Sequence, residues 1–189
     1  FTLVVVVIFF ACETKLSPTS PVTRNSDFKP AALSSTVADI VVNSTSDVMD
    51  FGDPMTVEAL PGPDGLVTLR EAIMAANYTA GAQTIAFNIP TSDPGFDGSV
   101  FTINLESALP RLDGDGTVID GSTQADFSGD SNPAGPEITL DGSSTEWPAL
   151  TLNGANMHIH QLVLNRFRMN VIVILNDATH NAITGCYIG

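Results

Sequence analysis

Short apolar segments separated by turn-forming residues dominate the chain. In some of these segments, such as residues 101–105, apolar and polar residues alternate, whereas others, such as residues 171–175, are apolar throughout; both patterns are typical of β-strands. The expected strands span residues 39–43, 84–89, 101–105, 117–120, 138–141, 150–152, 158–164, 171–175 and 182–188. The 15 Gly and 12 Pro residues provide the turns between them. The pattern therefore predicts an all-β fold.

One segment departs from this alternation and predicts a helix. Thr68 and Glu71 have the spacing of a capping box, in which each side chain accepts a hydrogen bond from the backbone N–H of the other residue. Leu69, Ile73 and Ala76 then recur on one helical face. We expect a capped helix here, with that apolar face buried.

The strands near the C-terminal end repeat at a nearly constant distance. Three pairs of similar residues are each 24 positions apart, namely Ile159 and Ile183, Leu162 and Cys186, and Leu164 and Ile188. Leu150 and Leu152 match Val173 and Leu175 at a separation that is shorter by a single position. Strand–turn units that repeat at such a distance are typical of a solenoid whose coils stack in register. The repeat makes Cys186 an interior residue. Since the chain stops after a coil without a capping element, we expect the solenoid to be C-terminally truncated here.

The N-terminal segment predicts export. Residues 1–10 are apolar apart from one Thr, too short for a membrane helix of about 20 residues but suited to a signal peptide. The following Ala11-Cys12 resembles a lipobox, although Phe9 and Phe10 depart from that pattern. An ordinary secretory signal or a buried strand also stays open. We expect residues 1–12 to be the signal peptide, Cys12 to be lipidated, and the Ser/Thr/Pro-rich residues 13–36 to form a flexible tether.

The charge of the chain is strongly one-sided. Seven Lys and Arg residues face 21 Asp and Glu residues, which gives a net charge of −14. All but two of the acidic residues follow residue 36, where no Lys occurs. Such a body repels phosphate backbones and anionic polysaccharides. We therefore expect no nucleic-acid partner, and contact with a membrane only through the lipid anchor.

The densest acidic cluster consists of Asp113, Asp115 and Asp120. Calcium prefers several carboxylate and carbonyl oxygens in a flexible loop, so a Ca²⁺ site is one interpretation. Asp-Gly is also a common turn dipeptide, and Thr117 and Gln124 break the EF-hand pattern. The turn interpretation is favoured, so the sequence requires no cofactor, while Ca²⁺ stays open.

Two histidines form a second candidate metal site. His158 and His160 are two residues apart and therefore lie on the same side of a strand. No third ligand has a fitting spacing, because His180 falls in a turn of the next coil. We expect an exposed pair on the coil surface rather than a metal site.

Nine segments of the folded part resemble a known family in their order and spacing. The segments are 41–45, an Asp-rich loop at 47–65, 68–73, 76–77, 84–90, 107–110, 119–124, 141–142 and 187–189. Together they resemble the CSLREA-domain family of bacterial exported proteins over residues 39–189. The resemblance implies a right-handed parallel β-helix of pectin-lyase-like shape. Residues 37–100 would then form an N-terminal cap and residues 101–189 the first coils.

The resemblance also implies roles for the helix residues. In the family a helix covers the open first coil, which gives Thr68, Arg70 and Glu71 structural roles, with Arg70 reaching an Asp of the loop at 47–65. The family carries a Cys, often disulfide-bonded, where this chain has Val67. The loop must therefore be held by packing, by its prolines or by an ion.

Two functions are consistent with these observations. The first is a non-catalytic, exported cell-surface β-helix module, a spacer, adhesin or glycan-binding part of a larger protein. We expect it to be monomeric, with glycans or cell-surface proteins as partners. The alternative is a polysaccharide lyase or glycoside hydrolase of pectin-lyase-like fold, its site mostly in further coils and Arg166 and Arg168 as substrate contacts. The motifs of hydrolase nucleophiles, P-loops and zinc proteases do not occur, so we favour the first.

Overall fold

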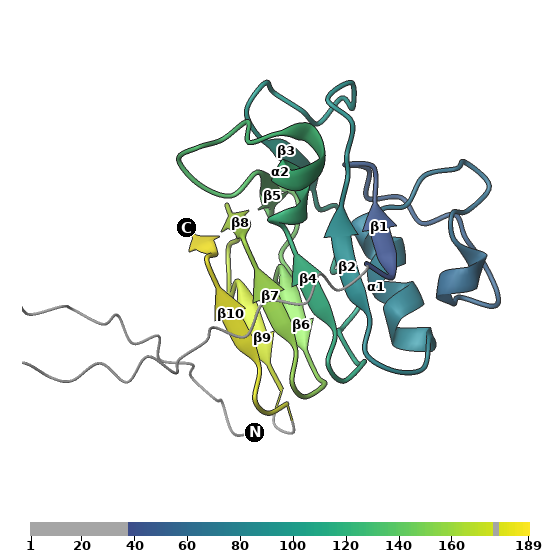
Figure 1. Cartoon of the computed structure of the whole chain (residues 1–189). Helices are drawn as coiled ribbons and strands as arrows, with labels where there is room; N and C mark the ends of the chain where they lie inside the picture. Colours follow the sequence, from purple (N-terminus) through teal and green to yellow (C-terminus); the bar gives the residue numbers. More distant parts are fainter. Residues whose placement is uncertain (1–37, 176–177) are drawn as a thin grey trace, which may run out of the picture. The chain divides into compact units, whose positions relative to one another are not determined.

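Parallel strands make up most of the structure, a computed structural model that describes residues 38–175 and 178–189 (Figure 1). The strands are β1 (Ile40–Val42), β2 (Thr84–Phe87), β3 (Phe101–Asn104), β4 (Val118–Asp120), β5 (Ile138–Asp141), β6 (Leu150–Leu152), β7 (His158–His160), β8 (Leu162–Asn165), β9 (Ile172–Ile174), β10 (Ala182–Thr184) and β11 (Tyr187–Ile188). The helices are the 3-10 helix η1 (Val57–Ala59), α1 (Leu69–Tyr78) and α2 (Thr123–Ser128). The described part is mostly sheet with few helices, as the alternating pattern predicts. The signal segment, the lipidation of Cys12 and the tether, all predicted from the sequence, fall outside the described residues.

The strands pair in parallel and form three sheets. Sheet A has the order β1-β2-β4-β7-β10, sheet B has β3-β5-β8-β11, and sheet C has β6-β9. A bridge between Leu112 and Leu152 adds one more segment to sheet C. The chain passes through sheets A, B and C in turn and then returns to A, and we call one such passage a circuit. The circuit β4-β5-β6 is followed by β7-β8-β9, and β4, β7 and β10 lie side by side in Figure 1.

Apolar residues stack in register from one circuit to the next. The pairs are Ile85 with Ile119, Ile119 with Ile159 and Ile159 with Ile183 in sheet A, and Leu164 with Ile188 in sheet B. The pairings of Ile159 with Ile183 and of Leu164 with Ile188 are those that the sequence repeat predicts, and they are confirmed. Ile85, Ile119 and Ile159 are fully buried, so the ladder of isoleucines forms the centre of the core.

The predicted pairing in sheet C is wrong by a single position. Leu150 pairs with Ile172 and Leu152 with Ile174, rather than with Val173 and Leu175. A shift by one residue moves every side chain of a strand to the opposite face. In the observed register Ile172 and Ile174 pack against the core. Burial of Ile172 and Ile174 therefore selects the pairing of residues 22 positions apart over the predicted pairing of residues 23 positions apart.

Two segments predicted as single strands are each divided by a corner. Residues 158–164 form β7 and β8, with the break at Gln161, and residues 182–188 form β10 and β11, with the break at Gly185 and Cys186. Gln161 and Gly185 have φ angles of 53° and 63°, a left-handed conformation that ends a strand. The chain turns there from sheet A into sheet B.

The predicted capped helix is α1, and its capping box is confirmed. The Thr68 Oγ1 accepts from the Glu71 N–H at 3.2 Å, and the Glu71 carboxylate accepts from the Thr68 N–H at 2.9 Å. Leu69, Ile73 and Ala76 are buried. The helix packs against β1 and β2, the first two strands of sheet A. In the part of the chain that is described, no helix has the length and apolar character needed to cross a membrane.

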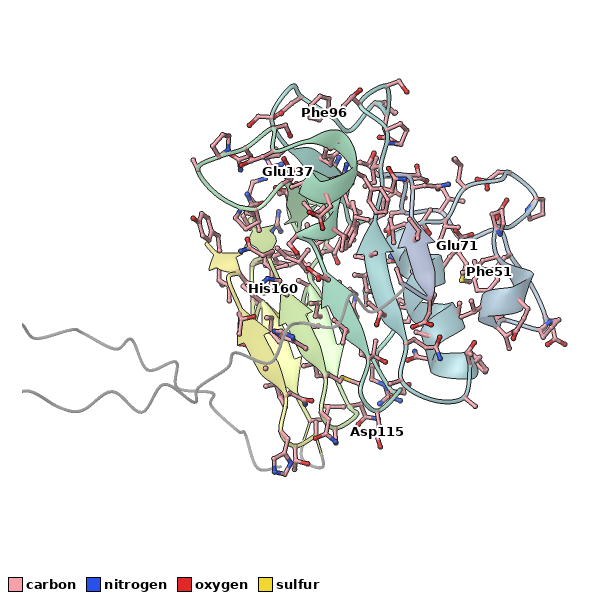
Figure 2. All side chains as sticks on the ribbon, in the orientation of Figure 1. Phe51, Glu71, Phe96, Asp115, Glu137 and His160 are labelled. Atoms are coloured by element: carbon pink, nitrogen blue, oxygen red, sulfur yellow. The ribbon has the colours of Figure 1, made fainter. Side chains whose placement is uncertain are left out.

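The two charged residues of α1 hold the loop at 47–65. Arg70 forms an ion pair with Asp47 at 2.7 Å, as the resemblance implies. Glu71 is 1 % exposed and accepts a further bond from the Asp50 N–H at 2.9 Å. Phe51 is buried in the core between these contacts, and Figure 2 shows it close to Glu71. Ionic, hydrogen-bonded and apolar contacts thus hold the loop at 47–65 in place.

Candidate functional site

The corner between sheet A and sheet B differs in length between circuits. Only Gln161 separates β7 from β8, and only Gly185 and Cys186 separate β10 from β11. The two earlier connections from sheet A to sheet B are longer, because residues 88–100 separate β2 from β3, and residues 121–137, which form α2 and a loop, separate β4 from β5. Insertions into a stacked repeat gather on one face, which is often the binding face. This corner is therefore the first candidate for a functional site.

A pocket of about 520 Å³ lies at this corner, and we call it the corner pocket. One part of its wall comes from α2 and the loop at 129–137, and another from the corners of the next two circuits. The side chains in the wall that can form hydrogen bonds are Ser122, Asp130, Asn132, Glu137, Gln161 and Tyr187. The volume falls within the range of about 300–1,000 Å³ that is usual for small-molecule sites.

Hydrogen bonds to the neighbouring strands fix α2 in place. The Gln124 side chain is fully buried, accepts from the Ile89 N–H at 2.8 Å and donates to the Ile89 carbonyl at 2.9 Å. The Thr123 hydroxyl donates to the Asp120 carbonyl at 2.7 Å and accepts from the Phe87 N–H at 2.8 Å. These bonds join the insertion to β2 and β4, so this part of the pocket wall has a defined position.

Glu137 is a buried carboxylate in the pocket wall, and it is 4 % exposed. Its Oε1 accepts from the Ser131 N–H and lies 3.0 Å from the Ser131 hydroxyl. Its Oε2 is buried and has no hydrogen-bond partner among the described residues. Within the same part of the chain, no Arg or Lys forms an ion pair with it. This oxygen has almost no accessible surface, so the carboxylate is enclosed by the protein and does not face the pocket.

Gln161 and Tyr187 form the opposite part of the wall. Gln161 has the left-handed φ of 53°, whereas the next circuit has Gly185 at the equivalent corner. The Tyr187 hydroxyl donates to the Ala134 carbonyl at 3.0 Å. Its ring lies so close to Gly135 that a Cβ there would stand 2.6 Å from the ring. The ring is nevertheless partly open, because Tyr187 is 54 % exposed.

The three carboxylates of the predicted acidic cluster each accept a hydrogen bond from a different donor. Asp113 accepts from the Asn153 side-chain amide at 2.7 Å, Asp115 from the Ala155 N–H at 2.8 Å, and Asp120 from the Ser122 N–H at 3.0 Å. Across residues 38–175 and 178–189, no group of three or more His, Cys, Asp or Glu side chains is arranged to hold a metal ion. Figure 2 shows Asp115 and Glu137 at opposite ends of the strands, whereas Asp120 ends β4 and bonds to Ser122 of the pocket wall, so Asp115 and Asp120 do not form one site.

We expect addition of millimolar Ca²⁺ to leave the Tm of the protein unchanged within about 1 °C. The physical reason is that each of these carboxylates already accepts a hydrogen bond from a different protein donor, and Ca²⁺ needs six to eight oxygens around one point. The measurement is a thermal melt followed by circular dichroism, with Mg²⁺ as the control for ionic strength. A rise of several degrees with Ca²⁺ alone would establish the calcium site.

The two histidines lie on the same face of β7, as predicted. Their ring centroids are 5.4 Å apart, and both rings reach the Thr184 hydroxyl, His158 Nε2 at 2.6 Å and His160 Nδ1 at 2.8 Å. Both side chains are half-buried rather than exposed, because β10 lies beside them. His180 lies in a turn with a φ of 57°. The pair thus contributes hydrogen bonds between two circuits.

The two arginines that the enzyme hypothesis singles out each lie next to a carboxylate. Arg166 forms an ion pair with Asp141, which is buried, and Arg168 lies 3.8 Å from Glu146 at the surface. Neither arginine lines the corner pocket. A second hollow of about 340 Å³, which we call the Trp147 groove, lies beside Glu146 and Trp147.

Cys186 is a free, partly buried residue that packs against the core. Burial raises the pKa of its thiol, while hydrogen bonds from the backbone oppose that rise. A thiol with a raised pKa carries little thiolate at neutral pH and is a weak nucleophile. These observations agree with the structural role predicted from its alignment with Leu162.

Sequence reasoning missed the corner pocket and its residues. Glu137 and Gln161 belong to no motif, Tyr187 appears only as part of the family-like segment 187–189, and the three lie on different circuits or corners. The one available signal is the spacing of the expected strands, because a long gap separates residue 120 from residue 138. Comparison of the chain with family models, with curated proteins and with solved structures finds no match.

Proposed function

We propose that this protein is an exported, non-catalytic surface module, built as a right-handed parallel β-helix with α1 as its N-terminal cap. The observation that carries this proposal is the regular return of the chain to sheets A, B and C with parallel, in-register pairing. In such a stack each coil buries its apolar face against its neighbours, which gives a rigid body with repeated outer surfaces. Bodies of this kind serve to hold a recognition surface at a distance from the cell.

Glycans are the partner that this body fits best. The wall of the corner pocket combines a carboxylate, amides and hydroxyls with one aromatic ring, and such groups exchange hydrogen bonds with sugar hydroxyls. The net charge of −14 opposes binding of nucleic acid. Export through the N-terminal segment, with lipidation of Cys12, belongs to the same proposal. So does a monomeric state.

The test is exposure of the purified protein to a broad panel of immobilised and soluble glycans. We expect binding to a subset of the panel, with neither unsaturated products nor new reducing ends in the soluble fraction. One set of reactions contains added Ca²⁺, which a calcium-dependent lyase requires. A parallel set contains a chelator and serves as its control. Release of unsaturated sugars would favour the lyase alternative, and new reducing ends would favour the hydrolase.

A further inference from the structure

We propose that the Trp147 groove binds a neutral saccharide unit, with the Trp147 indole as the surface on which the sugar packs. This inference rests on the proposed glycan-binding function and names its site and ligand class. Three observations support it. Two large apolar side chains are exposed in one hollow, the turn that carries Trp147 is anchored on both sides, and the charges around the groove are balanced.

Two turns that lead from sheet B to sheet C line the groove, and they belong to successive circuits. Trp147 lies in residues 142–149, which join β5 to β6, whereas Met169 and Asn170 lie in residues 166–171, which join β8 to β9. Trp147 is 61 % exposed and Met169 is 69 % exposed. Single apolar side chains are common at protein surfaces, but here two large ones line the same hollow. The groove therefore offers apolar area that a ligand can cover.

The turn that carries Trp147 is held on both sides of this residue. The Trp147 N–H donates to the Thr145 hydroxyl at 3.2 Å, and Thr145 itself is buried. On the other side the Ala149 N–H donates to the Val171 carbonyl at 2.8 Å, which ties this turn to the turn of the next circuit. The backbone of the groove is thus positioned before a ligand arrives, and such preorganisation lowers the entropic cost of binding.

The charges next to these two turns favour a neutral ligand. Arg168 lies 3.8 Å from Glu146, and Arg166 forms an ion pair with Asp141. Two basic side chains therefore balance two carboxylates here, although the whole chain has a net charge of −14. A neutral sugar avoids the repulsion that an anionic sugar meets from the acidic body. The Glu146 carboxylate can accept from its hydroxyls, and the Asn170 amide can both donate and accept.

The size of the groove favours a small ligand over a protein partner. Five residues line the groove, whereas a stable protein–protein interface involves about 20–30 residues on each side. Its volume of about 340 Å³ lies within the range of about 300–1,000 Å³ that is usual for small-molecule sites. A sugar unit presents C–H groups on one face, which pack favourably against an aromatic ring, and hydroxyls around its edge. An indole with polar side chains beside it matches that mixed character.

The test uses Trp147 as its own reporter, because it is the single tryptophan of the chain. Cellotriose, mannotriose and galactotriose are the neutral probes, and trigalacturonate is the anionic probe. We expect at least one neutral probe to shift the tryptophan emission to shorter wavelength in a saturable way, since a sugar on the ring displaces water from it. Titration calorimetry should give the same dissociation constant. We expect no response to trigalacturonate.

Two substitutions in the groove test the contacts separately. Trp147→Ala, followed by calorimetry, should weaken binding by about tenfold or more, because the apolar contact with the ring is lost. Asn170→Ala keeps the reporter and should weaken binding by about threefold or more, the usual effect of one hydrogen bond. Both side chains are exposed, so we expect each variant to keep its Tm within about 2 °C.

The matched control is Phe127→Ala. Phe127 is also an exposed aromatic residue, at 56 %, and it lines neither the Trp147 groove nor the corner pocket. We expect the affinity of this variant to stay within about twofold of the unchanged protein, the scatter of a neutral surface change.

Binding that leaves the Trp147 emission unchanged and survives Trp147→Ala would overturn the inference. Glycan binding would then stand with its site elsewhere, such as the corner pocket. A stronger response to trigalacturonate than to the neutral probes would overturn the neutral ligand class. Any other soluble glycan that the broad panel retains is titrated in the same way. If the panel retains no glycan, the proposed glycan-binding function itself fails.

Discussion

Replacing Ile119 by alanine should lower the free energy of unfolding by about 3–4 kcal/mol, whereas replacing its neighbour Val118 should cost less than about 1 kcal/mol. Ile119 is fully buried and stacks between Ile85 and Ile159, so its truncation leaves a cavity in the centre of the core. Val118 lies on the opposite face of the same strand, half-buried, where it pairs with Thr84 and His158.

The measurement is urea denaturation of both variants, followed by far-ultraviolet circular dichroism and analysed with a common slope. The two substitutions lie on adjacent residues and remove the same kind of side chain, so Val118→Ala controls for any effect on strand propensity. Equal losses would contradict the register of sheet A, because a slip by one residue exchanges the two faces.

Arg70→Ala should destabilise the protein by about 3–5 kcal/mol, the usual cost of leaving a buried charge without its partner. The Arg70 guanidinium donates to the Asp47 carboxylate at 2.7 and 3.0 Å and to the Ala108 carbonyl at 2.6 Å. The side chain of Asp47 is 6 % exposed. Without Arg70, the Glu106 N–H is, among the described residues, the one donor from another part of the chain that its carboxylate keeps.

A double-mutant cycle separates the ion pair from simple loss of packing. Asp47→Ala combined with Arg70→Ala should cost clearly less than the sum of the two single changes, since the double variant leaves no unpaired charge. Arg111→Ala is the matched control, because Arg111 is exposed, and we expect it to change stability by less than about 0.5 kcal/mol. Additive losses would show that Arg70 and Asp47 act independently.

Elements that depend on local spacing were predictable from the sequence. Thr68 and Glu71 are three residues apart and form their capping box within one helical turn. The pairing of Ile159 with Ile183 follows from a repeat of similar residues at a constant separation. The predicted register of sheet C was wrong because Val173 and Leu175 are as apolar as their neighbours Ile172 and Ile174. Residue type alone therefore allows two registers that differ by a single position.

The corners were less predictable than the strands. The apolar positions shift at Gln161, from Ile159 before it to Leu162 and Leu164 after it, and the left-handed backbone at that position divides the segment into β7 and β8. The helix α2 has no capping signal of its own, since Ser122 makes no side-chain cap bond. It depends instead on Gln124 and Thr123, which bond to the segment of β2 and Ile89 in another circuit.

By itself the sequence determined the predominance of β-strands, the capped helix, the repeat distance of the last strands in sheets A and B, and the excess of acidic residues. These properties follow from residue type and short-range spacing. Only the tertiary structure decided where the corner pocket lies, because Glu137, Gln161 and Tyr187 come together through the stacking of successive circuits. No pattern along the sequence predicts these contacts, because they join positions that are far apart in the chain.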